Sequence, residues 1–189
     1  MVFPRIVMRY LICLTLLILA FLASGCDFAQ QGLHLAPRDG IYLMPRDYVG
    51  SVVILYDQPD GVVPDVEGDY YVYKIPSSGV LRVRTSPYLG IVNLKYFYVD
   101  QAGERQEVKY ITITGDHDPQ GRPQNKYGNL SQDEVENSIF VMNPSGVGEF
   151  RLNGKTIQFS RIIVGKPKDS EQLFDEYRKK LVEVQRALS

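Results

Sequence analysis

The sequence lacks tryptophan and has only two cysteines and two histidines among its 189 residues. Two cysteines cannot form the disulfide framework of a small secreted domain. Lysine and arginine number 21 against 22 aspartate and glutamate, so the net charge of −1 gives no basic excess for nucleic-acid binding. With 44% hydrophobic and 23% charged residues, the composition is globular and excludes a wholly disordered or collagen-like chain.

Motifs of the common enzyme and cofactor classes are also missing from the sequence. There is no H-E-x-x-H, no P-loop and no G-x-G-x-x-G. Ser145 follows Asn143-Pro144 and does not lie in a G-x-S-x-G elbow. We therefore predict that the protein is not an enzyme and holds no metal or cofactor. A hydrolase that uses His117 with nearby acids is the alternative from the enzyme class.

The first 26 residues have the pattern of a secretory signal. Arg5 and Arg9 are the only charged residues there, and the segment Leu11–Leu22 is almost purely apolar. A basic start, a short apolar run and small residues before a cleavage site define a signal peptide. The run is short for a membrane-spanning helix, which needs about 20 residues.

The end of this segment, Leu22-Ala23-Ser24-Gly25-Cys26, resembles a bacterial lipobox, with Ala23 at the position where leucine is usual. The resemblance implies that diacylglycerol is attached to Cys26 and that cleavage occurs before it, so the partner of Cys26 is the lipid bilayer. Two or three acyl chains hold a protein stably on a membrane. The alternatives are an uncleaved anchor and a plain signal peptide cut elsewhere.

Localisation follows from the anchor. A lipidated Cys26 places the protein on the extracytoplasmic side of the cell membrane. In a Gram-negative cell, Asp27 resembles the retention signal that keeps lipoproteins in the outer leaflet of the inner membrane. In a Gram-positive cell, Asp27 has no such meaning.

The sequence changes character after residue 38, and the whole chain can be divided into four predicted segments. We predict a signal peptide (1–25), a tether (26–38), a β-domain (39–165) and a C-terminal helix (166–189). At about 3.3 Å per residue, the tether reaches about 40 Å when extended.

The β-domain is predicted from short segments rich in strand-forming residues and separated by Gly, Pro and Asp turns. Asn153-Gly154 is the strongest hairpin signal. We expect a mainly β fold, an antiparallel β-sandwich or open barrel of about nine strands. The nine segments are 41–44, 51–57, 69–75, 79–85, 93–99, 107–114, 139–142, 148–152 and 155–164.

The C-terminus changes to a helical period. One apolar stripe with spacings of three and four residues predicts an amphipathic helix over about 170–188. The stripe is formed by Leu173, Tyr177, Leu181, Val184 and Leu188. Docking on the sheet is the first interpretation, and binding of a partner protein is the second.

A long connection, 115–138, contains the candidate binding loop. Asp116, His117 and Asp118 resemble the start of a calcium loop, but Tyr127 stands where an EF-hand needs glutamate, so an ordinary polar turn is the alternative. Ser131 and the three residues after it could cap one short helical turn.

An acidic group of five carboxylates precedes and overlaps one predicted strand. Acid–base chemistry needs particular separations and a raised pKa on one carboxyl, and the sequence indicates neither. We interpret the group as solvated loop charge. It consists of Asp57, Asp60, Asp65, Glu67 and Asp69.

Tyrosine is abundant, with 13 residues, ten of them between Tyr42 and Tyr110. Tyrosine is favoured in strands, and it also stacks on ligands and anchors interfaces. An envelope receptor for carbohydrate or peptide that uses a tyrosine-rich face is therefore an alternative function. That function needs exposed tyrosines clustered on one face.

Several strings carry a family resemblance: Gly40-Ile41-Tyr42-Leu43-Met44-Pro45, Tyr73-Lys74-Ile75-Pro76 and Gly79-Val80-Leu81. They resemble an uncharacterised bacterial domain of unknown function that is often found behind a lipobox, over about 40–110 and extending towards Gly165. The resemblance brings no catalytic residues. We expect a membrane-anchored extracytoplasmic lipoprotein with a non-catalytic β-domain that binds a partner or supports the envelope; the identity of an envelope protein partner stays open.

Overall fold

The structure is a computed structural model that describes residues 39–90, 92–117, 119–144 and 146–189. These residues belong to one compact unit, 37–189. The predicted signal peptide and tether, Cys26 and Asp118 lie outside the described residues.

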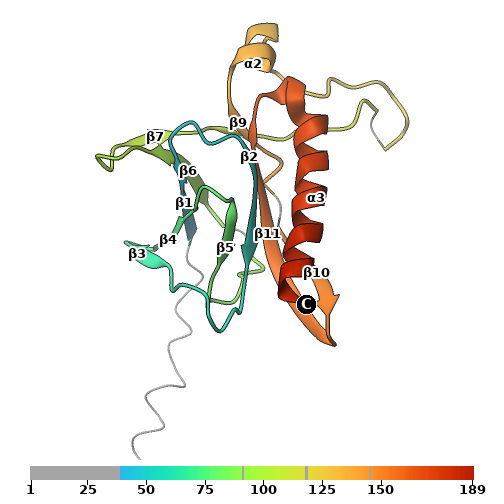
Figure 1. Ribbon diagram of the computed structural model, residues 1–189. Coiled ribbons are helices and arrows are strands. Elements are labelled where there is room, and N and C mark those ends of the chain that lie inside the picture. Colours follow the sequence, from blue (N-terminus) through green and yellow to red (C-terminus); the bar gives the residue numbers. More distant parts are fainter. Residues whose placement is uncertain (1–38, 91, 118, 145) are drawn as a thin grey trace, which may run out of the picture. The chain divides into compact units, whose positions relative to one another are not determined.

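The described chain contains eleven strands arranged in two sheets (Figure 1). The first sheet has the order β3-β4-β1-β6-β7, and the second has the order β5-β2-β11-β9-β8 with β10 paired to β11. The strands are β1 (Asp39–Pro45), β2 (Gly50–Leu55), β3 (Asp65–Glu67), β4 (Tyr70–Lys74), β5 (Val80–Arg82), β6 (Leu94–Val99), β7 (Arg105–Glu107), β8 (Tyr110–Ile111), β9 (Phe140–Met142), β10 (Val147–Leu152) and β11 (Lys155–Gly165). The helices are α2 (Gln132–Asn137), the 3-10 turn η2 (Pro167–Asp169) and α3 (Ser170–Leu188).

The mainly β class with one long C-terminal helix is confirmed, and the sheets are mixed instead of wholly antiparallel. β1 lies between β4 and β6 and pairs with both in parallel. The cause is the chain path. After β1 the chain crosses to the second sheet to form β2, so β1 does not pair with the strand that follows it in the sequence and lies instead between β4 and β6.

Two predicted elements differ in detail from the structure. The segment 107–114 is not one strand: β7 pairs with β6 in the first sheet, whereas β8 pairs with β9 in the second. The chain changes sheets at the buried Val108. β3 lies inside the acidic group, where we expected only a loop.

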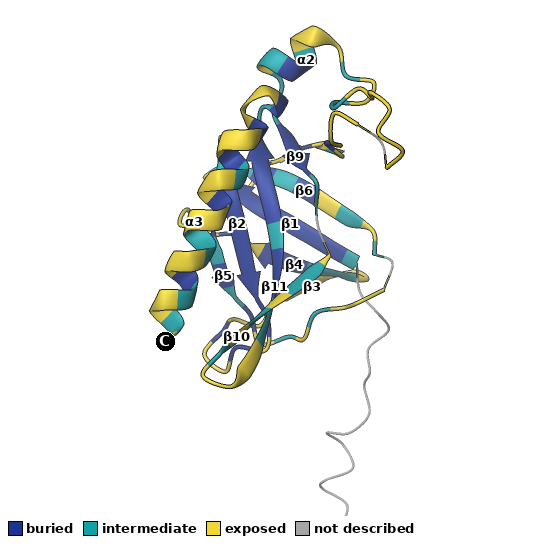
Figure 2. Ribbon diagram, turned by 90° about the vertical axis from the view of Figure 1, so that its right-hand side faces the viewer, coloured by how far each residue is buried: buried dark blue, intermediate teal, exposed yellow. Residues whose placement is uncertain are grey.

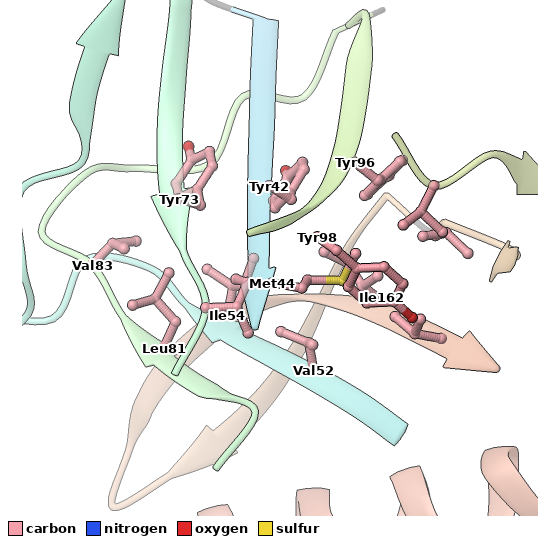
Figure 3. Close-up of a cluster of buried hydrophobic side chains, with 14 of the residues drawn as sticks. Tyr42, Met44, Val52, Ile54, Tyr73, Leu81, Val83, Tyr96, Tyr98 and Ile162 are labelled. Atoms are coloured by element: carbon pink, nitrogen blue, oxygen red, sulfur yellow. The ribbon is translucent and has the colours of Figure 1, made fainter. Parts of the chain in front are cut away.

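The main core fills the space between the sheets (Figure 3). β2 is buried on both faces. Val52 and Ile54 pack against the first sheet, while Val53 and Leu55 belong to a second core beneath α3. The Asn153-Gly154 hairpin between β10 and β11 is also confirmed, with φ of 49° and 77° at its two central residues.

α3 lies along the outer face of the second sheet, with its polar side towards solvent (Figure 2). Leu173, Tyr177 and Val184 are buried against β2 and β11, and Leu181 and Leu188 are partly buried in the same core. The docking interpretation of the apolar stripe is therefore confirmed. Among the described helices, none has the length and apolar character that a membrane span requires.

Candidate functional site

The candidate binding loop lies before α2 on the surface. Asp116 and His117 are both exposed, and their main-chain carbonyls accept hydrogen bonds from the Gln124 backbone N–H (2.9 Å) and the Gln124 Nε2 (3.1 Å). No group of three or more metal-ligating side chains occurs in the part of the chain that the structure describes. The short helical turn predicted after Ser131 is confirmed as α2, with the reciprocal Ser131–Glu134 capping box.

The acidic group is spread over loops and strand edges, and most of its members have basic partners. Asp60 pairs with Arg82 at 2.7 Å, and Asp65 pairs with Lys74 at 2.7 Å. Glu67 accepts two hydrogen bonds from the Arg105 guanidinium, at 2.9 and 2.7 Å. This hydrogen bonding lowers the pKa of the Glu67 carboxyl, so the group is a charged surface element.

The tyrosines form the most distinctive arrangement in the described structure. Tyr73, Tyr42 and Tyr96 occupy matching positions on β4, β1 and β6. Adjacent strands lie about 4.8 Å apart, so side chains in register can stack ring on ring. The ring centroids are 5.0 Å apart for Tyr42–Tyr73 and 5.2 Å for Tyr42–Tyr96. We call these three residues the tyrosine stack; Figure 3 shows them side by side across the three strands.

The tyrosine stack faces the second sheet and is buried. Its rings therefore stack on one another inside the core and do not form the exposed face that the receptor alternative needs. Tyr71 tilts against Tyr73, and Tyr110 meets Tyr96 edge-on, each at 6.4 Å between centroids.

The hydroxyl groups of these tyrosines are neutral hydrogen-bonding groups at physiological pH. Burial, reinforced by the neighbouring tyrosines, raises the pKa of Tyr42 well above its ordinary value. Burial also raises the pKa of Tyr73 and of Tyr56. Tyr56 donates a hydrogen bond to Ser160 Oγ at 3.1 Å. A phenol with a raised pKa is a poor base or nucleophile and remains a good donor or acceptor.

A cavity of about 490 Å³ reaches these hydroxyl groups from outside. We call it the tyrosine cleft. Its volume is in the range of small-molecule sites, which combine apolar walls with a few polar groups. Polar lining comes from Tyr42, Tyr56, Tyr73, Tyr88 and Ser160, and apolar lining from Leu89, Val92, Leu94, Pro144 and Val147.

Sequence reasoning identified the abundance of tyrosine and missed the tyrosine cleft. The lining residues are contributed by β1, β4, β6, β10 and β11, by the residue after β2 and by the loops that follow β5 and β9. Each tyrosine alone resembles an ordinary strand residue. Only the strand register, which the composition does not give, brings them together.

Residues 37–172 match a family model described as a family of unknown function (DUF6843). The chain belongs to this family. No curated protein matches the sequence. Among solved structures, the chain is similar to one from Bacillus anthracis that is described as a candidate lipoprotein, with 20% identity, a TM-score of 0.45, and coverage of 67% of this chain and 68% of that one. At that level of similarity, the crystal structure carries no argument about the function of this DUF6843 member.

Proposed function

We propose that this DUF6843 member is a lipid-anchored extracytoplasmic protein whose β-domain works by binding and not by catalysis. The anchor rests on one observation, the lipobox-like Leu22–Cys26 string behind a signal-peptide pattern. The family match begins at residue 37, so the β-domain follows Cys26 after a tether of about a dozen residues.

The tyrosine cleft supports a binding role. Its polar lining residues are four tyrosines and one serine, and much of the remaining lining is apolar. Stacked rings on three hydrogen-bonded strands are held rigidly, so little side-chain freedom is lost when a ligand enters. The cleft therefore suits an uncharged, partly apolar group, such as a sugar or a peptide side chain of the envelope. If the protein is a receptor for carbohydrate or peptide, its ligand contacts the tyrosine hydroxyl groups in the cleft and not exposed tyrosine ring faces.

The anchor is tested by fatty-acid labelling in cells. Cys26→Ser should abolish labelling and leave the signal peptide uncleaved by the lipoprotein peptidase. Cys13→Ser changes the other cysteine and is the matched control, in which labelling should persist. Acyl label on the Cys26→Ser protein would contradict lipidation at this residue.

The binding role is tested with a fluorescent reporter in the tyrosine cleft. Because the chain has no tryptophan, Tyr88→Trp introduces a single one at the cleft. Soluble glycan–peptide fragments of the cell wall should change its emission saturably, and Ser160→Ala should weaken the response because it removes a lining hydroxyl. Val182→Trp on the exposed face of α3 is the control and should not respond. Equal responses at positions 88 and 182 would refute specific binding in the cleft.

The enzyme alternative depends on His117. If the protein acts by binding, His117→Ala should leave the cell-wall response of the Tyr88→Trp reporter unchanged. Release of a cleavage product by the wild-type protein, lost in His117→Ala, would instead establish a hydrolase.

A further inference from the structure

The parallel strands of the first sheet place several segments at one end of the β-domain. β1, β4 and β6 run in the same direction and begin within one residue of each other in register, since Asp39 pairs with Tyr70 and Gly40 pairs with Leu94. The segments that lead into these strands therefore meet at the same sheet edge. One of them is the segment that connects Cys26 to Asp39.

Hydrogen bonds join these strand starts. The Asn93 backbone N–H donates to Asp39 Oδ1 at 2.9 Å, and the Gly40 N–H donates to the Asn93 carbonyl at 3.2 Å. Asn93 Nδ2 donates to Tyr70 Oη at 3.2 Å. The end of the loop between β5 and β6 is thus tied directly to the residue where the described chain begins.

This loop carries an unusual amount of exposed apolar surface. Leu89 is 75% exposed, more than any other large hydrophobic residue in the described part of the chain, and Tyr88 beside it is 45% exposed. A Cβ at Gly90 would lie 2.1 Å from Tyr88 Oη, so the tyrosine ring packs closely over the glycine. We call Tyr88 and Leu89, which also line the mouth of the tyrosine cleft, the apolar tip.

We propose that the apolar tip inserts into the surface of the bilayer to which Cys26 is anchored, an inference that rests on the proposed function. Twelve residues separate Cys26 from Asp39 and span at most about 40 Å, so the domain stays near the membrane with the tip at its anchored end. Tyrosine prefers the headgroup level of a membrane, and a leucine beside it can enter the acyl boundary.

Charge at this end favours apolar insertion over electrostatic attraction. Asp39 and Asp69 are acidic, whereas Lys95 is basic and lies 4.3 Å from the Tyr70 ring centroid. With both signs present, the surface has no polybasic character that would attract anionic lipid. Membrane contact through the apolar tip should therefore change little with salt concentration.

The scarcity of cysteine allows a direct test in the full lipidated chain. After cleavage the only cysteine is Cys26, whose sulfur is blocked by the diacylglycerol thioether, so Leu89→Cys provides a single labelling site. The labelled protein is reconstituted into vesicles of phosphatidylethanolamine and phosphatidylglycerol that carry brominated acyl chains. Bromine about 5–10 Å below the headgroup boundary should quench a dye at position 89.

Val49→Cys is the matched control. Val49 is 53% exposed and lies between β1 and β2, beyond the end of β1 opposite Asp39. A dye there should not be quenched. If the protein is bound to vesicles but the dye at position 89 is not quenched, the inference is wrong. Equal quenching at positions 89 and 49 would also overturn it. A dye at position 89 that is shielded from solvent but not quenched by bromine would overturn it too, and would indicate that a protein partner covers the tip. Wild-type protein that does not remain with the vesicles overturns the proposed anchor, and this inference with it.

Discussion

Replacement of Gly79 by alanine should destabilise the β-domain through crowding at one turn. Gly79 has a φ of +72° and closes the turn from Pro76, whose carbonyl accepts its N–H at 2.9 Å. A Cβ at this position would lie 2.2 Å from Tyr48 Oη, 2.5 Å from the Ser51 carbonyl oxygen and 2.7 Å from Lys180 Nζ.

The atoms that crowd Gly79 form a small network that connects α3 to β2 and to the turn before β5. Lys180 Nζ donates to the Ser51 carbonyl at 2.6 Å and to the Ser78 carbonyl at 3.1 Å. Tyr48 Oη donates to the same Ser51 carbonyl at 2.8 Å. Partial burial lowers the pKa of Lys180. A methyl group at Gly79 cannot enter without moving some of these partners.

The expected loss of unfolding free energy has two parts. Left-handed backbone costs about 1–2 kcal/mol for a residue with a Cβ, and overpacking adds about 1–3 kcal/mol. Gly154→Ala isolates the first part, because Gly154 has a φ of +77° and no atom within 4 Å of the added Cβ. Gly79→Ala should therefore cost about 2–5 kcal/mol and Gly154→Ala only about 1–2 kcal/mol.

Urea unfolding followed by circular dichroism measures both losses. A double-mutant cycle with Lys180→Met adds a second check, since removing Nζ should make Gly79→Ala less costly. Losses for the two glycine variants that agree within about 0.5 kcal/mol would refute the reasoning, because crowding would then contribute nothing measurable.

Three further results are expected. The chain after Cys26 has no other cysteine, so a reductant should leave the melting temperature of the mature protein unchanged, and a fall of several degrees would contradict this. Leu181→Asp places a charge in the core beneath α3 and should cost at least about 2 kcal/mol in urea unfolding. Val182→Asp on the exposed side of the same helix should cost less than about 0.5 kcal/mol, and similar losses would mean that α3 is not docked. Burial raises the pKa of Tyr48 and of Tyr98 to about 12, while unfolded tyrosine titrates near 10. The shifted pKa values of these two tyrosines therefore stabilise the folded state fully below pH 10, and this contribution is lost as the pH rises towards 12. If Tyr48 and Tyr98 ionise near pH 10 while the protein stays folded, as seen by tyrosinate absorbance and circular dichroism, the prediction is wrong.

The candidate site shows how much of a binding site can be predicted from residue types alone. The count of tyrosines was visible in the sequence, but their role depended on which strands become neighbours. Tyr42, Tyr73 and Tyr96 are 31 and 23 residues apart along the chain and meet only because β1 pairs with both β4 and β6. Asp116 and His117 were candidate binding residues because their segment resembles the start of a calcium loop, and in the structure both are exposed on a loop.

The sequence by itself determined the local elements. Asn153-Gly154 produced a hairpin because both residues tolerate positive φ, and the apolar period after residue 170 produced a helix that buries one stripe. Signals of this kind act within a few residues, so they can be predicted without the fold. The parallel pairing of β1, the change of sheet at Val108 and the position of Asn93 beside Asp39 could not be predicted from local signals. These depend on which distant segments bury each other's apolar faces, and strands with the same alternating pattern can satisfy that requirement in several arrangements.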